Sequence, residues 1–170
     1  LALEGATVVG IDLAEAGLEV AKLHLLESGL DIDYQFISAE ELAQSEIESF
    51  DVITCLEMLE HVPDPSLIIE ACSKLVKSNG RVFFSTINRN PKSYFFAIVG
   101  AEYVLNLLPK GTHNYEKFIR PSEIDGWARL YDLSISSMIG MTYNPLTKKY
   151  KLDDDVSVNY IIHYKKKSGI

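Results

Sequence analysis

The sequence lacks an apolar run of the roughly 18 to 20 residues that a membrane-spanning helix needs, and no secretory signal is visible. Cysteine is scarce: Cys55 and Cys72 are the only two, they have no metal-type spacing, and both stand in apolar stretches. We therefore expect buried, reduced thiols, which fit a cytoplasmic protein. A basic surplus is missing too, since the net charge is −8, and this argues against nucleic acid as a general partner.

The chain also lacks an initiator methionine. It opens with Leu1-Ala2-Leu3-Glu4-Gly5, which is typical of a helix end that runs into a strand. We interpret the chain as N-terminally truncated. Its 170 residues, 47% of them hydrophobic, fit one domain with a sizeable core, so we predict a single domain over residues 1–170.

Strand and helix patterns alternate through the first half. Short β-rich runs predict strands, and apolar residues at helical spacing predict helices between them. Asp64 and Pro65 suit the N-cap and first position of a helix that we expect to end at Asn79-Gly80. The expected strands are 6–12, 33–38, 50–55 and 81–87, and the expected helices are 14–28, 39–47 and 65–79. This order predicts an α/β fold with a doubly wound, mostly parallel sheet.

The pattern changes after Asn88. Residues 93–108 predict a strongly apolar helix, and Pro121 opens a shorter helix towards Leu130. The alternating runs 133–139 and 156–164 predict a terminal antiparallel pair of strands. We expect this pair to be joined through the turn-rich residues 143–145.

Ligands of a doubly wound sheet lie at the carboxyl ends of its strands, which draws attention to Asp12. This carboxylate ends the first predicted strand and can accept hydrogen bonds from both hydroxyls of a ribose. Such a site would bind an adenosine-containing cofactor, a dinucleotide or S-adenosylmethionine alike. The alternative is an ordinary N-cap for the helix that follows.

A second group of polar residues follows the 50–55 strand. If residues 57–61 form one helical turn, then Glu57, Glu60 and His61 share a face. Two carboxylates and an imidazole can hold Mg²⁺ or Mn²⁺. The alternative is that one glutamate is structural and that His61 caps or packs.

Two features lie in the second half. His113 follows Lys110-Gly111-Thr112 and is a candidate proton acceptor, or else a loop residue with a local hydrogen bond. The segment from Arg89 to Arg120 carries five Lys or Arg against two Glu, so it is basic within an acidic chain. An apolar helix with basic flanks suits the surface of an anionic membrane. A helix buried under the domain, or in a dimer interface, is the alternative.

Several stretches together resemble a known family, the bacterial ubiquinone-biosynthesis O-methyltransferases. The run Leu56 to Pro65 (LEMLEHVPDP) is similar to the motif that follows the fourth strand of class I methyltransferases. The more specific stretches are Phe84–Asn90 and Lys110–His113, and the others are 4–8, 20–24, 100–103 and 158–160. The resemblance covers the whole chain.

The resemblance implies a function and a set of site residues. The implied reaction moves a methyl group from S-adenosylmethionine to a phenolic hydroxyl of a polyprenylated catechol or demethylubiquinol. Asp12, with Leu13 beside it, and Leu56 match cofactor-binding positions. The metal positions of the family fall on Glu57, Glu60 and His61, which strengthens the expectation of Mg²⁺ or another divalent cation.

The resemblance also implies a place in the cell and names what is missing. It implies peripheral association with the inner membrane, through an apolar helical insertion at about residues 92–114, and contact with other ubiquinone-biosynthesis proteins. The glycine-rich loop of the family has no match. We expect this loop, the first strand and an upstream arginine to lie before Leu1.

Three other functions are weighed against this one. The first is a methyltransferase of a soluble small molecule. The second is an inactive truncated domain that only binds lipid or a partner. The third is a nicotinamide-dependent dehydrogenase, which Asp12 alone would fit, but the terminal antiparallel pair and the Leu56–Pro65 run argue against it.

Overall fold

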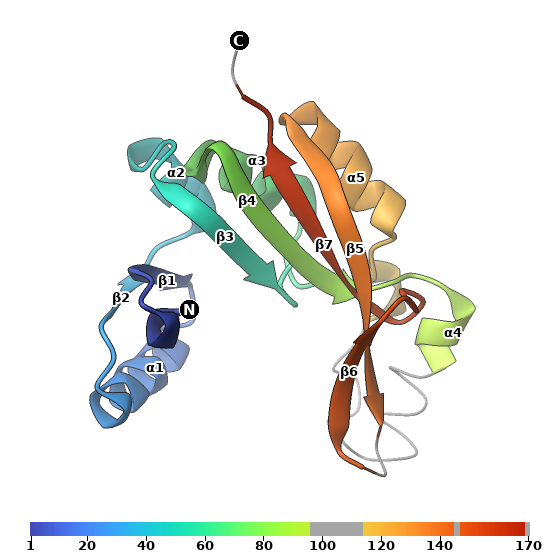
Figure 1. Ribbon diagram of the computed structural model, residues 1–170, viewed down its shortest axis with the longest axis horizontal. Coiled ribbons are helices and arrows are strands. Elements are labelled where there is room, and N and C mark those ends of the chain that lie inside the picture. The colour runs from blue at the N-terminus through green and yellow to red at the C-terminus, as the bar shows by residue number, and fades with distance from the viewer. Residues whose placement is uncertain (96–113, 145–146, 169–170) are drawn as a thin grey trace. The chain divides into compact units, whose positions relative to one another are not determined.

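The computed structural model describes residues 1–95, 114–144 and 147–168 (Figure 1). The chain divides into two units, Leu1–Glu46 and Ile47–Ile170. We call them unit 1 and unit 2 and describe each by itself. None of the described helices has the length and apolar character needed to cross a membrane.

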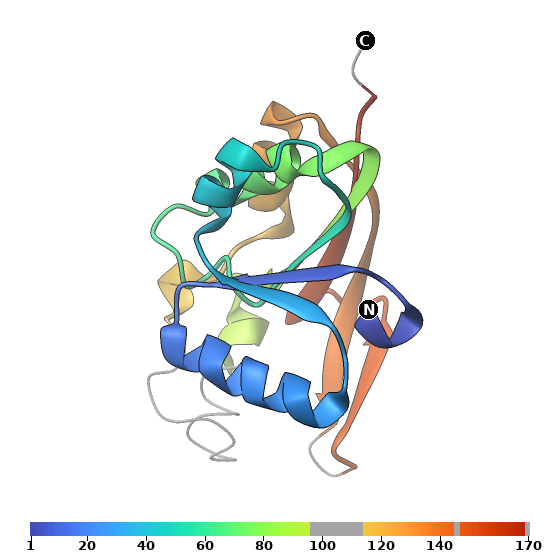
Figure 2. The ribbon, with the colours of Figure 1, turned by 90° about the vertical axis from the view of Figure 1, so that its left-hand side faces the viewer.

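Unit 1 is a parallel pair of strands flanked by helices. Strand β1 (Val8–Asp12) pairs with β2 (Ile32–Phe36) in register from Val8↔Ile32 to Asp12↔Phe36. Helix α1 (Glu15–Ser28) connects the two strands and lies alongside them (Figure 2). The remaining elements are η1 (Ala2–Glu4) and α2 (Ala39–Ser45).

The helix ends of unit 1 follow from local chemistry. Gly29 adopts a left-handed conformation (φ 66°) and its amide donates to the Leu25 carbonyl, which ends α1 where the sequence predicts. At the start of α2, the Ser38 hydroxyl accepts from the Glu41 amide while the Glu41 carboxylate accepts from the Ser38 amide. This capping box fixes the predicted acidic helix.

Unit 2 is built on a five-stranded mixed sheet in the order β3-β4-β7-β5-β6. Only β3 and β4 run parallel; the other neighbours are antiparallel. The strands are β3 (Phe50–Leu56), β4 (Val76–Ile87), β5 (Leu133–Asn144), β6 (Lys149–Asp153) and β7 (Asn159–Lys166). The described helices are α3 (Pro65–Leu75), α4 (Pro91–Ser93), η3 (Tyr115–Lys117) and α5 (Pro121–Leu130).

Helix α3 begins as predicted and ends earlier than predicted. The Asp64 carboxylate accepts from the Ser66 amide and Pro65 occupies the first turn. The predicted end at Asn79-Gly80 is wrong, because Val76 is already extended and pairs with Phe50 of β3. Val76 is fully buried, and its β-branched side chain suits a strand. Asn79 does adopt the left-handed conformation (φ 65°), but within an irregular stretch of β4.

The predicted terminal antiparallel pair is confirmed, with one strand missed between its members. Strands β5 and β7 pair antiparallel from Leu133↔Lys166 onwards. The turn after Asn144 leads into β6 instead, which forms a hairpin with β5 before the chain returns to β7. Four of the five β6 side chains are exposed, so the strand lacks the one-sided apolar alternation that predicts strands.

The core of unit 2 lies on the face of the sheet that α3 and α5 cover (Figure 1). Alternate residues of β4 and their antiparallel partners on β7 fill it, because side chains of a strand point to opposite faces in turn. The rings of Phe84 and Tyr164 meet edge to face at 6.0 Å. These fully buried residues are Val82, Phe84, Thr86, Tyr160, Ile162 and Tyr164.

Candidate functional site

Asp12 and Leu13 lie at the carboxyl end of β1, in unit 1. Asp12 is exposed, and its Oδ1 accepts a hydrogen bond from the Ala14 amide at 2.8 Å. Ala14 is the N-cap residue of α1, so the N-cap alternative for Asp12 is wrong. Leu13 is 62% exposed. An exposed carboxylate beside an exposed leucine can accept hydrogen bonds from hydroxyl groups and give apolar contact to a ring.

Leu56 is the last residue of β3, in unit 2, and its side chain is 52% exposed. It therefore also lies at the carboxyl end of a parallel strand, the edge at which α/β sheets bind their ligands. Its side chain can offer only apolar contact.

Glu57 turns the chain sharply as it leaves β3. Its backbone is left-handed (φ 52°), which costs a non-glycine residue about 1 to 2 kcal/mol. Ser85 of β4 contacts both ends of the residue: its carbonyl accepts from the Glu57 amide at 3.0 Å, and its hydroxyl donates to Glu57 Oε1 at 2.7 Å. The condition of one helical turn over residues 57–61 is not met, since only a single turn from Met58 to His61 forms and Glu57 lies outside it.

Glu60 and His61 differ in environment. Glu60 is only 5% exposed, and its Oε2 accepts a hydrogen bond from the Thr86 hydroxyl, with 2.7 Å between the two oxygen atoms. His61 is exposed. The three residues predicted to hold a metal are therefore a half-buried, a buried and an exposed side chain.

The hydroxyls that hold the two glutamates point in opposite directions. Ser85 and Thr86 are consecutive residues of β4, so their side chains leave opposite faces of the sheet. Glu57 therefore meets β4 on one face and Glu60 on the other. In the part of the chain that the structure describes, no three His, Cys, Asp or Glu side chains come together as a metal site. Glu57, Glu60 and His61 therefore do not form one group in this arrangement.

Two predicted features lie outside the described residues. The structure does not describe residues 96–113, which include His113 and residues 96–108 of the predicted apolar helix. The described residues before them include α4, where the Asn90 side chain accepts from the Ser93 amide.

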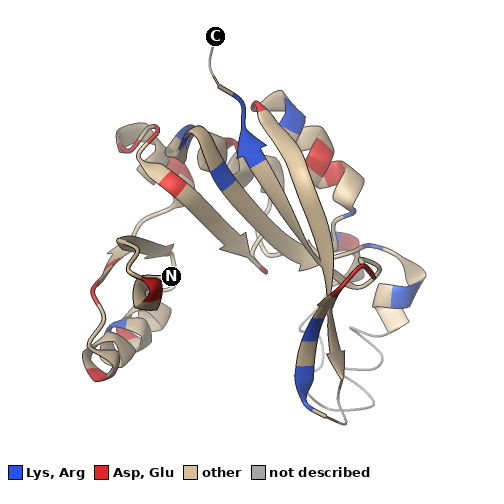
Figure 3. Cartoon of the chain, viewed as in Figure 1, with Lys and Arg blue, Asp and Glu red and all other residues tan. Residues whose placement is uncertain are grey.

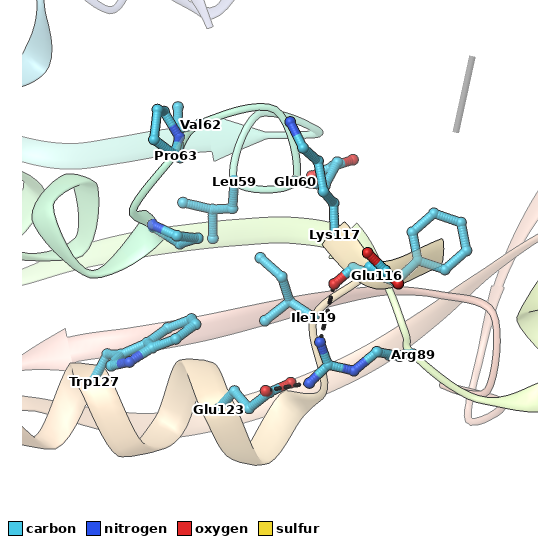
Figure 4. A pocket seen from close by; sticks show the side chains of 12 residues that line it. Leu59, Glu60, Val62, Pro63, Arg89, Glu116, Lys117, Ile119, Glu123 and Trp127 are labelled. Atoms are coloured by element: carbon cyan, nitrogen blue, oxygen red, sulfur yellow. Dashed lines mark hydrogen bonds and ion pairs between the residues drawn. The ribbon is translucent and has the colours of Figure 1, made fainter. Parts of the chain in front are cut away.

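A pocket of about 300 Å³ opens in unit 2, and we call it the β3–α5 pocket (Figure 4). Its walls come from the turn between β3 and α3 with the first residue of α3, from Arg89 after β4, and from η3, α5 and the chain between them. The lining residues are Leu59, Glu60, Val62, Pro63, Pro65, Arg89, Glu116, Lys117, Phe118, Ile119, Glu123 and Trp127.

Two of the charged residues that line the β3–α5 pocket, Arg89 and Glu123, form an ion pair. The Arg89 guanidinium forms an ion pair with the Glu123 carboxylate and donates to the Glu116 carbonyl at 3.2 Å (Figure 4). Sequence reasoning missed Arg89, Glu123 and Trp127 as site residues. The available signal was the single tryptophan of the chain, which stands on the predicted helix that Pro121 opens.

Comparison with known sequences gives consistent results. Residues 1–84 match the family described as a methyltransferase domain. The ubiquinone biosynthesis O-methyltransferase of Pseudomonas syringae pv. tomato is 64% identical over 162 residues, which cover 95% of this chain and 70% of that protein. The protein of the same name from Stutzerimonas stutzeri is 63% identical over 168 residues, covering 99% of this chain and 72% of the relative.

Solved structures agree on the fold. A SAM-dependent methyltransferase from Methanosarcina mazei matches with a TM-score of 0.71 at 18% identity, over 99% of this chain and 85% of that one. A SAM-dependent methyltransferase of Thermotoga maritima, described as a possible histamine N-methyltransferase, gives 0.69 at 19% identity, over 94% and 73%. The predicted α/β class is therefore confirmed.

Proposed function

Because the chain belongs to the family of ubiquinone biosynthesis O-methyltransferases, we propose that it methylates a phenolic hydroxyl of a polyprenylated catechol or demethylubiquinol. S-adenosylmethionine is the methyl donor. The observation that carries this function is the 64% identity to a relative of which the chain covers 70%. Structural neighbours that match 99% of the chain support one methyltransferase domain over residues 1–170.

The residues at the strand ends fit the cofactor chemically. We propose that Asp12 accepts hydrogen bonds from the ribose hydroxyls and that Leu13 and Leu56 contact the apolar parts of the cofactor. Their exposure at the carboxyl ends of β1 and β3 supports this assignment. When bound, S-adenosylmethionine supplies an activated methyl group, so the protein mainly has to orient the acceptor oxygen.

A divalent cation on Glu57, Glu60 and His61 stays a hypothesis. The donor types suit Mg²⁺, but the arrangement of the two glutamates about β4 does not favour a shared ion. Chelation of metals tests the hypothesis directly. His113 as the proton acceptor also stays a hypothesis, which a His113→Gln variant tests through the pH profile of turnover.

Membrane contact is the remaining part of the proposal. The basic surplus between Arg89 and Arg120 supports peripheral contact with an anionic bilayer, where the polyprenyl substrate resides. Cosedimentation with anionic and with neutral vesicles tests it: binding to both or to neither would contradict an electrostatic contribution. Contact with other ubiquinone-biosynthesis proteins is proposed on the family alone.

The decisive experiment follows methyl transfer from labelled S-adenosylmethionine to a catechol that carries a short prenyl tail, with Mg²⁺ and with EDTA. Transfer that depends on Mg²⁺ supports both the substrate class and the metal hypothesis. Transfer that is indifferent to EDTA supports the enzyme and removes the metal. Cofactor binding without transfer points to a different small-molecule acceptor.

A further inference from the structure

The β3–α5 pocket lies next to the carboxyl ends of β3 and β4. Glu60 follows the carboxyl end of β3, and Arg89 follows the carboxyl end of β4. This edge binds ligands in open α/β sheets. All lining residues belong to unit 2, so the pocket is formed within a single unit.

Glu60 gives the pocket a fixed hydrogen-bond acceptor. The side chain is buried, and the Thr86 hydroxyl holds one carboxylate oxygen in place. A carboxylate can accept about four hydrogen bonds, so the Thr86 contact leaves capacity for a further donor. A donor on a ligand would offset the cost of burying this charged group.

The other charges of the pocket do not favour an anionic ligand. The positive charge of Arg89 is neutralised by its ion pair with Glu123. Lys117 is exposed at the rim (Figure 4). Glu60, Glu116 and Glu123 against Arg89 and Lys117 leave a formal charge of −1, from three acids and two bases among the lining residues. A neutral ligand with hydroxyl donors suits this balance better than a phosphate or a carboxylate.

The apolar walls set the size and shape of the ligand. Trp127 offers the face or edge of an indole, and Leu59, Phe118 and Ile119 add apolar surface. About 300 Å³ is at the low end of small-molecule sites, which suits one substituted aromatic ring and not a long prenyl chain.

We propose that the β3–α5 pocket binds the phenolic ring of the substrate, with Glu60 accepting a hydrogen bond from a ring hydroxyl and Trp127 packing against the ring. This inference rests on the proposed function. In this proposal Glu60 is a hydrogen-bond acceptor that Thr86 orients. Glu57 contacts Ser85 on the other face of β4, so it does not compete for the same position.

The single tryptophan of the chain makes the pocket directly measurable. The short-tailed prenyl catechol is titrated into the protein while tryptophan fluorescence is followed, and the same titration of a Trp127→Phe variant isolates the signal of Trp127. We expect saturable quenching in the unmodified protein and its loss in the variant. A calorimetric titration of both proteins measures binding independently of fluorescence.

The acceptor role is tested with a matched pair of substitutions. Glu60→Gln keeps the size of the side chain and replaces the charged acceptor, so we expect the Kd for the catechol to rise about tenfold while the Kd for S-adenosylmethionine is unchanged. Glu70→Gln on α3, which does not line the pocket, is expected to leave both unchanged. Thr86→Val should weaken catechol binding, because valine lacks the hydroxyl that orients Glu60. Thr86→Ser keeps a hydroxyl and should bind the catechol as the unmodified protein does.

The outcomes separate this inference from the proposed function. Methyl transfer to the catechol with the same catechol Kd in Glu60→Gln and Glu70→Gln would overturn the ring site and leave the function standing. Calorimetric binding without any change in Trp127 fluorescence would also overturn it. Absence of methyl transfer to any prenylated catechol would instead count against the proposed function.

Discussion

The phenol of Tyr160 donates a hydrogen bond to the carbonyl oxygen of Ile119, with 2.7 Å between the two oxygen atoms. Both residues are buried, and the Ile119 amide donates in turn to the Ile87 carbonyl at 3.0 Å. The chain that enters α5 is thereby fixed to the middle of the sheet. Burial raises the pKa of Tyr160 far above its usual range, so the phenol stays a donor. Phe118 and Ile119 consequently form a fixed wall of the β3–α5 pocket.

Replacing Tyr160 with phenylalanine should lower the free energy of unfolding by about 1 to 2 kcal/mol, because the Ile119 carbonyl loses its buried donor. Urea denaturation measures this. Tyr143→Phe on β5 is the control, because Tyr143 is 38% exposed and its hydroxyl can bond to water. Equal losses in the two variants would contradict a specific role for the Tyr160 hydroxyl.

Asp64 offers a test of how α3 is held at its start. Asp64→Ala removes the acceptor of the Ser66 amide, so we expect a loss of about 1 kcal/mol in the free energy of unfolding. Asp64→Asn retains an N-cap acceptor and should lose much less. The comparison is made by thermal and urea unfolding. An asparagine variant as unstable as the alanine variant would show that charge, and not capping, is responsible.

Asp155 links the chain near α4 to the turn between β6 and β7, where acidic residues follow one another along the chain (Figure 3). Hydrogen bonds from the Lys92 ammonium and from Ser157 lower the pKa of Asp155 to about 2 from an ordinary value of 3.8. Because the folded pKa is the lower one, this carboxylate contributes stability above pH 3.8, and the contribution is lost as the pH falls towards 2.

The cause of that shift is testable by substitution. Lys92→Met should raise the pKa of Asp155 towards 3.8, since the ammonium hydrogen bond is the largest cause. A carboxyl NMR titration measures it, and Lys151→Met, beside Asp153, is the control. If the pKa of Asp155 stays near 2 without Lys92, Ser157 is the main cause instead.

Asp12→Asn tests the proposed cofactor contact. Asparagine can still accept the Ala14 hydrogen bond, so the fold of unit 1 should persist, while the charged acceptor for the ribose is lost. We expect the Kd for S-adenosylmethionine to rise about tenfold by calorimetry. Asp33→Asn on β2, whose carboxylate is exposed and accepts from Gln35, should leave that Kd unchanged. Unchanged affinity in both variants would contradict the contact.

The local signals in the sequence predicted much of the fold, because the capping chemistry is encoded in adjacent residues. Asp64 with Pro65 marks a helix start, and Gly29 a helix end, that the structure confirms, whereas the capping box of Ser38 with Glu41 was not predicted. The end of α3 was mispredicted because Val76 responds to a strand partner far away in the sequence, Phe50, and not to its neighbours.

The site was harder to predict from spacing. Residues three and four apart share a face only on a helix, and the left-handed Glu57 breaks that geometry. Which face each glutamate meets depends on Ser85 and Thr86, more than 20 residues away. Likewise, Arg89 meets Glu123 only after β4 and α5 have packed into the same unit.

The neighbouring hydroxyls of Ser85 and Thr86 have a consequence for how this enzyme can be altered. Each hydroxyl positions one acid, and the strand between them separates the two contacts. Substitutions on the face of β4 that carries Thr86 can therefore change which methyl acceptor binds, while the contact between Ser85 and Glu57 on the other face stays intact. A library restricted to Glu60, Thr86 and Trp127 would then explore new aromatic substrates without disturbing the residues at the end of β3.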